Sequence, residues 1–158
     1  MKKILASIVC VVLLLTLAAC SSQPQESAKH VDGELTEIFA KIYENVVDVT
    51  PPLTMEVAVD DTNKASMLGT DEVVFTEGLA SEAAIMTIPH SMVLIRVDNS
   101  VDIQKTKDLI KANVDPRKWI CVGVDPSQVI VDSIGDLVFL VMSEGAEAYH
   151  ASFLKLAE

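Results

Sequence analysis

The most constraining feature of this 158-residue chain is its first twenty residues, which carry the pattern of an export signal that is removed before folding. Lys2 and Lys3 precede a nearly unbroken apolar run over residues 4–15. That run is shorter than the roughly 20 apolar residues that a membrane-spanning helix needs. The pattern therefore predicts that residues 1–19 are a signal peptide and contribute nothing to the fold.

The end of this segment predicts a lipoprotein, because Leu17-Ala18-Ala19-Cys20 follows the apolar run. The small side chains of Ala18 and Ala19 suit a peptidase that holds an extended backbone, and Cys20 offers a thiol for a diacylglyceryl group. We expect cleavage between Ala19 and Cys20 and lipidation of Cys20. Two acyl chains attach a protein stably, since each buried methylene contributes about 0.8 kcal/mol. The expected location is the outer, extracytoplasmic face of a bacterial cell membrane; an ordinary secretory signal that happens to contain a cysteine is the alternative.

The charge balance restricts the partners of the mature chain. The full sequence has 12 basic and 23 acidic residues, a formal net charge of −11. Loss of residues 1–19 removes Lys2 and Lys3 and no acid, which leaves 10 basic residues and a formal charge of −13. Nucleic acid and anionic lipid headgroups should be repelled. We therefore expect no nucleic-acid partner and a membrane contact through the acylated Cys20; nothing in the sequence supports or excludes a homo-oligomer.

Composition divides the remaining chain into a tether and one domain. Residues 20–31 are mostly polar and lack apolar periodicity, which predicts a flexible tether with a reach on the order of 18 Å. Residues 32–158 are enough for a single domain with its own core. Cys121 is the one cysteine left in that domain, so no internal disulfide is expected. Its apolar neighbours Ile120 and Val122 favour a small buried side chain over a redox-active thiol.

Hydrophobic periodicity predicts the elements of the domain. An apolar stripe at three- and four-residue steps predicts a helix over residues 33–48, which Pro51-Pro52 ends. Later helices are expected over 101–113 and 144–157, with Ser100 and Ser143 as candidate caps. Apolar runs predict antiparallel strand pairs at 83–88 with 92–97, and at 129–132 with 137–142 around Gly135; a shorter strand near 55–59 and a short helix ending at Gly69 are weaker signals.

This order (helix, strand-strand, helix, strand-strand, helix) predicts a two-layer α+β fold: a mainly antiparallel sheet of about four strands with helices packed on one face. One feature of the strands does not fit a half-exposed sheet. Both alternating sets of residues in 92–97 and 137–142 are largely apolar. Either the first helix covers the second face of the sheet, which we favour, or that face contacts another molecule.

The layout resembles a known group of proteins. The segments that carry the resemblance are the signal with its cysteine, the polar tether, the strand Ser91-Met92-Val93-Leu94-Ile95-Arg96-Val97 and the hairpin at residues 135–143. Together with the helix at 105–113 they are similar to small extracytoplasmic lipoproteins of low-GC Gram-positive bacteria, catalogued as a domain of unknown function. The resemblance spans residues 35–156. It implies anchoring outside the cytoplasm and no assigned reaction.

No motif of catalysis or metal binding is present in the sequence. His30, His90 and His150 lie far apart with no His-x-x-x-His pair, and no serine lies in a Gly-x-Ser-x-Gly elbow. The six glycines are scattered singly, so a phosphate-binding loop is not expected. We therefore predict no catalytic residue, no metal, no cofactor and no enzyme activity.

One local cluster is a candidate for a partner contact. Arg117 and Lys118 precede Trp119, the single tryptophan, so an aromatic surface adjoins a basic patch. The alternative is that Trp119 plugs the edge of the sheet. Two functions follow: a non-enzymatic binding or assembly module of the cell envelope with a protein partner, or a solute-binding lipoprotein for a small cationic or peptidic ligand. A flat exposed apolar patch would favour the first, and a cleft with converging carboxylates the second.

Overall fold

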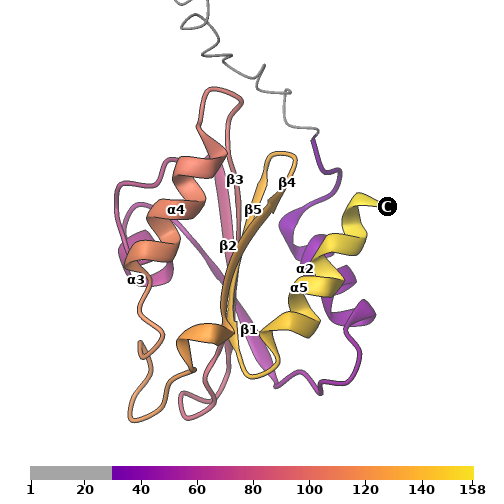
Figure 1. Cartoon of the computed structure of the whole chain (residues 1–158), viewed down its shortest axis with the longest axis vertical. Coiled ribbons are helices and arrows are strands. Elements are labelled where there is room, and N and C mark those ends of the chain that lie inside the picture. Colours follow the sequence, from indigo (N-terminus) through magenta and orange to yellow (C-terminus); the bar gives the residue numbers. More distant parts are fainter. Residues whose placement is uncertain (1–29) are drawn as a thin grey trace, which may run out of the picture.

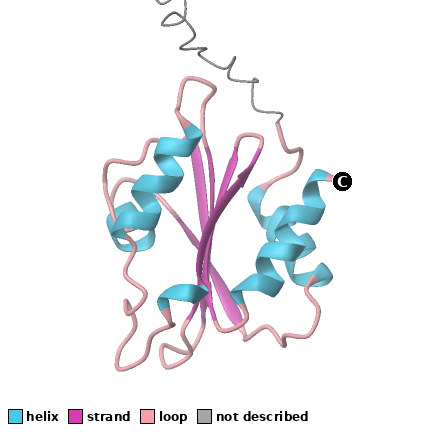
Figure 2. Ribbon diagram, viewed as in Figure 1, coloured by secondary structure: helices cyan, strands magenta, loops and turns pink. Residues whose placement is uncertain are grey.

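A computed structural model describes residues 30–158. The predicted signal peptide (1–19), its cleavage site, the lipidation site Cys20 and most of the predicted tether (20–31) lie outside the described residues. Within the described part, the chain is an α+β fold built on an antiparallel sheet (Figure 2). No helix in this part is long and apolar enough to cross a membrane.

The sheet has the strand order β1-β2-β3-β5-β4, and every neighbouring pair is antiparallel. The strands are β1 (Thr54–Ala58), β2 (Glu77–Ala83), β3 (His90–Arg96), β4 (Val129–Ile134) and β5 (Leu137–Ser143). The helices of the described part are α2 (Leu35–Asn45), α3 (Lys64–Leu68), α4 (Ile103–Asn113) and α5 (Ala146–Leu154), with 3-10 turns η1 (Pro126–Gln128) and η2 (Lys155–Ala157). The α+β class and the antiparallel sheet are confirmed, with five strands rather than about four.

Helices cover both faces of the sheet, so the fold has three layers rather than the two predicted. Figure 1 shows α2 and α5 on one side of the strands and α3 and α4 on the other. Met92 and Leu94 of β3 pack with α2 and α5, whereas Val93 and Ile95 pack in a second cluster that includes Ile110 of α4. Because both sets of side chains on β3 are apolar, each face must be shielded from water. The prediction that helices pack on one face is wrong, and the favoured alternative, that the first helix covers the second face, is confirmed.

The strand predicted over residues 83–88 is displaced toward the N-terminus. β2 ends at Ala83, and residues 84–89 form the reversal that leads to β3. Glu82 pairs with Ser91, so the chain needs the intervening residues to turn back. An apolar composition was therefore a misleading signal here, because Ile85 and Met86 belong to an exposed turn and not to a buried strand.

The last two helices begin differently from prediction. The Asp102 side chain, rather than Ser100, caps α4 by accepting a hydrogen bond from the Lys105 N–H. Helix α5 has Gly145 at its N-cap instead of Ser143, with φ +77°. A Cβ at Gly145 would lie 2.7 Å from Val49 Cγ2, so close packing against the α2–β1 connection also requires glycine there. In place of a local cap, the Gln128 side-chain oxygen accepts from the N–H groups of Gly145 and Ala146.

The Asp102 cap provides a test of how α4 starts. Replacing Asp102 with Ala should lower the free energy of unfolding by about 1 kcal/mol, since an orphan N–H at the first turn loses its acceptor. Ser100→Ala is the matched control and should change it by less than about 0.5 kcal/mol. Urea unfolding followed by circular dichroism measures both variants. Equal losses would contradict the assignment of the cap.

Candidate functional site

Exposed apolar side chains gather at one end of the sheet. Leu53 is 77% exposed, and Ile85 and Met86 of the β2–β3 turn are 54% and 56% exposed. Met55 on the edge strand β1 and Ile88 are exposed near the same end, and the Ala84 N–H bonds to the Leu53 carbonyl, which joins the start of β1 to the β2–β3 turn. Single exposed apolar residues are ordinary, whereas a group of them near one end of a sheet is a candidate contact surface. We call Leu53, Met55, Ile85, Met86 and Ile88 the apolar end.

The apolar end lies at the opposite end of the sheet from the point where the N-terminal segment joins it. β3 runs from His90 beside the apolar end to Arg96, whose guanidinium donates to the carbonyl oxygens of Val31 and Gly33. Seven strand residues span about 20 Å at the usual rise. Figure 1 shows the same arrangement, with the start of the described chain at the top and the β2–β3 turn at the bottom.

A buried polar network lies between the sheet and α2 at this end. The two ring nitrogens of His90 lie 2.9 Å from the Tyr43 hydroxyl (Nε2) and 2.8 Å from Ser143 Oγ (Nδ1). Tyr43 also bonds to Ser81 Oγ at 2.7 Å. His90 is 1% exposed, and burial together with the charge of Lys118 lowers the pKa of its imidazole to about 4. His90 is therefore neutral near pH 7.

The hydrogen bonds of this network assign the tautomer of His90. Ser143 donates its hydroxyl proton to the Glu144 carbonyl, so its oxygen is free to accept from His90 Nδ1–H. Nε2 then accepts from the Tyr43 hydroxyl, and Ser81 donates to Tyr43. This arrangement satisfies each group with one proton per bond. A hydrolytic triad needs the serine proton directed at the histidine and a carboxylate behind the ring, and here a tyrosine occupies the second place.

A pocket of about 400 Å³ adjoins the network and the apolar end. The α2–β1 connection contributes Pro51 and Pro52, the β2–β3 turn contributes Ile88, and His90 and Tyr149 lie on the side of the core. Sequence reasoning missed this site. Its residues are spread over four segments, and none stands in a recognisable motif.

The structure separates the three residues of the predicted partner contact. Trp119 is 8% exposed and packs in the core cluster that includes Ile110 of α4. Its burial favours the alternative that the indole fills space in the core rather than contacting a partner. The Lys118 ammonium bonds to Glu82 Oε1 at 2.8 Å and Ser91 Oγ at 3.0 Å. Arg117 alone is exposed. The segment therefore does not present an aromatic and basic patch to solvent.

Cys121 is exposed, so the prediction that it is a buried hydrophobe is wrong. Its backbone φ of +63° places it in a tight loop after Trp119. A bend in the backbone directs its side chain outward, whereas its apolar neighbours in the sequence had suggested burial. The neighbouring Ile120 is 65% exposed.

The three histidines lie in three different environments. His30 contacts Asp136 at 2.6 Å, His150 contacts Asp132 at 2.8 Å, and His90 belongs to the buried network. In residues 30–158, no group of three or more histidine, cysteine or acidic side chains is arranged to hold a metal ion.

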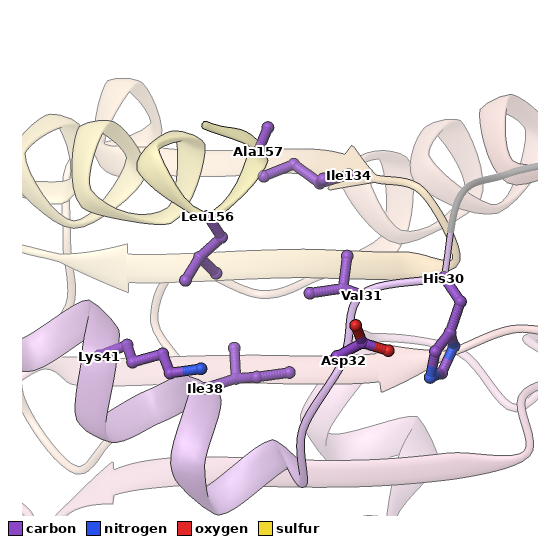
Figure 3. A pocket seen from close by; sticks show the side chains of 8 residues that line it. All are labelled: His30, Val31, Asp32, Ile38, Lys41, Ile134, Leu156 and Ala157. Atoms are coloured by element: carbon purple, nitrogen blue, oxygen red, sulfur yellow. The ribbon is translucent and has the colours of Figure 1, made fainter.

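A second pocket, of about 260 Å³, lies at the opposite end of the molecule, next to the start of the described chain. Figure 3 shows it between residues 30–32, α2 and the C-terminal turn, with Ile38 and Leu156 facing each other across it. Its polar side chains, His30, Asp32 and Lys41, are exposed. They present no buried polar group to a ligand.

No family model, no curated protein and no solved structure matches the chain. The resemblance to small Gram-positive lipoproteins stays a prediction. The geometry of residues 30–158 is therefore the basis on which a function is proposed.

Proposed function

We propose that the chain is a non-enzymatic binding module of the cell envelope, held to the outer face of the membrane through lipidated Cys20, and that the apolar end contacts an envelope protein. The single observation that supports this contact is the grouping of Leu53, Ile85 and Met86, each more than half exposed, beside the unpaired edge of β1. Burial of such side chains contributes about 1.5–3 kcal/mol each, which is enough for a few of them to dominate an interface.

The placement of the apolar end supports the proposal. Residues 30–33 join the domain at the Arg96 end of β3, and the lipid would be attached only about ten residues earlier. A tether of that size reaches on the order of 18 Å. The attachment point is thus near one end of the sheet, and the apolar end is on the other, where a partner can approach it without competing with the bilayer.

A second candidate function, capture of a small cationic solute, is favoured by a different observation. A shallow pocket of about 390 Å³ at the start of α5 is lined by the carboxylates of Asp125, Glu144 and Glu147. One carboxylate oxygen of Asp125 already accepts hydrogen bonds from the N–H and the hydroxyl of Ser127, which leaves mainly the other oxygen for a ligand. All three are solvent-exposed, where water competes for a cation, and we therefore rank this function second.

Site-specific cross-linking in intact cells of the native host tests the proposed contact. A photoactivatable side chain at Met86 should yield a discrete cross-linked product, because that residue belongs to the apolar end and is 56% exposed. Val74 is the matched control, since it is an apolar residue of similar exposure (65%) on the segment before β2, which reaches Arg96 through Thr76 at the other end of the sheet. Equal products from both positions would contradict a contact through the apolar end.

Anchoring is tested in the same cells. The chain should fractionate with membranes and carry acyl chains on Cys20 by mass spectrometry, and Cys20→Ser should release it. A bare Cys20 thiol in the native chain would contradict the anchoring half of the proposal, while the cross-linking result would still stand by itself.

A further inference from the structure

Strand β1 forms one edge of the sheet, and its pairing with β2 decides which of its backbone groups face outward. The Leu53 carbonyl and the Val59 N–H both bond to the neighbouring segment, residues 78–84. Successive residues of an antiparallel strand direct their N–H and carbonyl groups to opposite sides. The residues whose backbone groups point away from the sheet are therefore Thr54, Glu56 and Ala58.

The outward groups of Thr54 and Glu56 are free. The Ala58 carbonyl accepts a hydrogen bond from the Asn63 side chain at 2.8 Å. Within residues 30–158, no group bonds to the outward N–H or carbonyl of Thr54 or Glu56. Such an edge is a template for pairing with another chain, and proteins usually cover or interrupt it.

The opposite edge of the sheet is protected. No residue of β4 is exposed, and both α4 and α5 pack against this strand. The Asp132 carboxylate accepts from Lys107 of α4, from His150 of α5 and from the Ser133 N–H. By contrast, the exposed residues of β1 are Met55, Glu56 and Ala58.

The side chains make the β1 edge complementary to a second copy of itself. Val57 packs in the cluster on the α3 and α4 side, and alternation places Leu53 and Met55 on that face. Thr54 and Glu56 lie on the α2 face, where Glu56 bonds to α2. In an antiparallel pair centred on Met55, Leu53 of one copy opposes Val57 of the other, and Thr54 opposes Glu56. Apolar thus meets apolar on one face, and a hydroxyl meets a carboxylate on the other.

The neighbouring registers are less favourable. A pair centred on Glu56 places two carboxylates directly opposite each other. A pair centred on Thr54 directs the Glu56 carbonyl at Pro52, which has no N–H to donate. The register centred on Met55 avoids both faults, and it opposes Pro52 to Ala58, whose carbonyl is already satisfied.

We propose that a second copy of this chain pairs with β1 in the antiparallel register centred on Met55, so that two sheets join across a two-fold axis. Thr54 and Glu56 exchange their outward backbone hydrogen bonds with the other copy. A five-residue strand buries less than the about 800 Å² per partner of a stable dimer, so the dimer is in equilibrium with the monomer. The proposal goes beyond the envelope contact: Ile85 and Met86, on the turn between β2 and β3, stay available for it.

Disulfide cross-linking in intact cells of the native host tests the register, in a Cys121→Ser background that removes the exposed thiol. Two opposed residues at position 55 have a Cα separation of about 4.5 Å, within the range of a disulfide. Met55→Cys should therefore give a disulfide-linked homodimer under a mild oxidant. Glu56→Cys is the matched control, because its mate lies two positions along the strand, beyond about 7 Å. No homodimer from Met55→Cys, a disulfide to a different protein, or equal yields from both variants would overturn the proposal.

Sedimentation velocity of the mature chain with Cys20→Ser, under reducing conditions, tests the association itself. Met55→Lys places like charges opposite each other and should weaken the dimer about tenfold. Val74→Lys, at another apolar position that is more than half exposed, should not, and circular dichroism should show both variants folded. Dimerisation should strengthen with added salt, because both copies are strongly acidic, whereas binding of a basic segment at this edge would weaken. A monomer at every concentration, a dimer that Met55→Lys leaves unchanged, or weakening by salt would contradict pairing of two copies.

Discussion

Lowering the pH from 7 to 4 should reduce the free energy of unfolding of the wild type by about 3 kcal/mol more than that of a His90→Gln variant. Burial, aided by the positive charge of Lys118, lowers the pKa of His90 from 6.5 to about 4 in the folded protein. Above pH 6.5 neither state binds the proton, and the stability is complete. Between pH 6.5 and 4 the unfolded chain binds a proton that the folded protein excludes, so stability falls as the pH falls.

Urea titrations of the two proteins at half-unit pH steps measure this difference. Glutamine does not titrate, whereas His30 and His150 are present in both proteins, so their contributions cancel. The variant is expected to be less stable than the wild type at pH 7, because glutamine does not reproduce the hydrogen bonds that the imidazole makes with Tyr43 and Ser143. The test therefore compares how steeply the free energy of unfolding of each protein falls between pH 6.5 and 4, rather than the absolute stabilities. Parallel slopes would contradict the prediction, because they would mean that His90 takes up its proton over the same pH range in the folded and unfolded states.

Replacing Arg96 with Met should lower the free energy of unfolding by about 3 kcal/mol, because it leaves the largely buried carboxylate of Asp136 without its charged partner. The Arg96 guanidinium donates to both oxygens of Asp136, at 3.0 and 3.1 Å, and to the carbonyls of Val31 and Gly33. The two charged side chains are only 11% and 10% exposed. Residues 30–33 should also become a site of limited proteolysis, since the bonds from Arg96 attach them to the end of β3.

Two controls isolate the pair. Asp61→Asn removes the partner of Lys64 in an ion pair whose carboxylate is 91% exposed, and it should change stability by less than about 1 kcal/mol. Arg96→Met with Asp136→Asn should recover part of the loss, because the unpaired charge is gone. If the double variant lost as much stability as Arg96→Met and Asp136→Asn lose separately when added together, the two side chains would not be coupled and the account of this ion pair would be wrong.

The two predictions occupy separate pH ranges. Burial on its own raises the pKa of Asp136, but hydrogen bonds from the Val31 N–H, His30 and Arg96 outweigh burial and lower it below 3.8. A carboxylate with a lowered pKa stabilises the fold above pH 3.8, and that stability is lost as the pH falls through its folded value. The Arg96–Asp136 ion pair therefore stays intact over the pH range in which His90 is titrated.

Much of the fold was predictable because periodicity reports which side chains must be buried. The β4–β5 hairpin, with Gly135 at φ +55° in its turn, and the helices α2, α4 and α5 were predicted within a few residues. The boundary of β2 was not, because residues 84–88 are as apolar as a strand and yet form an exposed turn. Composition alone does not distinguish an exposed apolar turn from a buried strand.

The candidate site was not predictable in the same way. Trp119 and Lys118 were chosen because they are conspicuous in the sequence, but the first is core and the second is paired with Glu82. His90 and Tyr149 gave no local signal. They meet because β3 pairs with β5 and α5 packs back on that face, contacts between residues more than 50 positions apart.

The sequence by itself determined most of the element types, the antiparallel sheet and the apolar character of both of its faces, because local spacing decides which side chains align on one surface. It also carries the predicted export signal and Cys20 in consecutive residues. Only the tertiary structure decided that the apolar end lies opposite the point where residues 30–33 join the sheet, that His90 is neutral and that the Tyr149 hydroxyl is buried. Exposure, pKa and hydrogen-bond satisfaction depend on neighbours brought together by folding, and no local pattern records them.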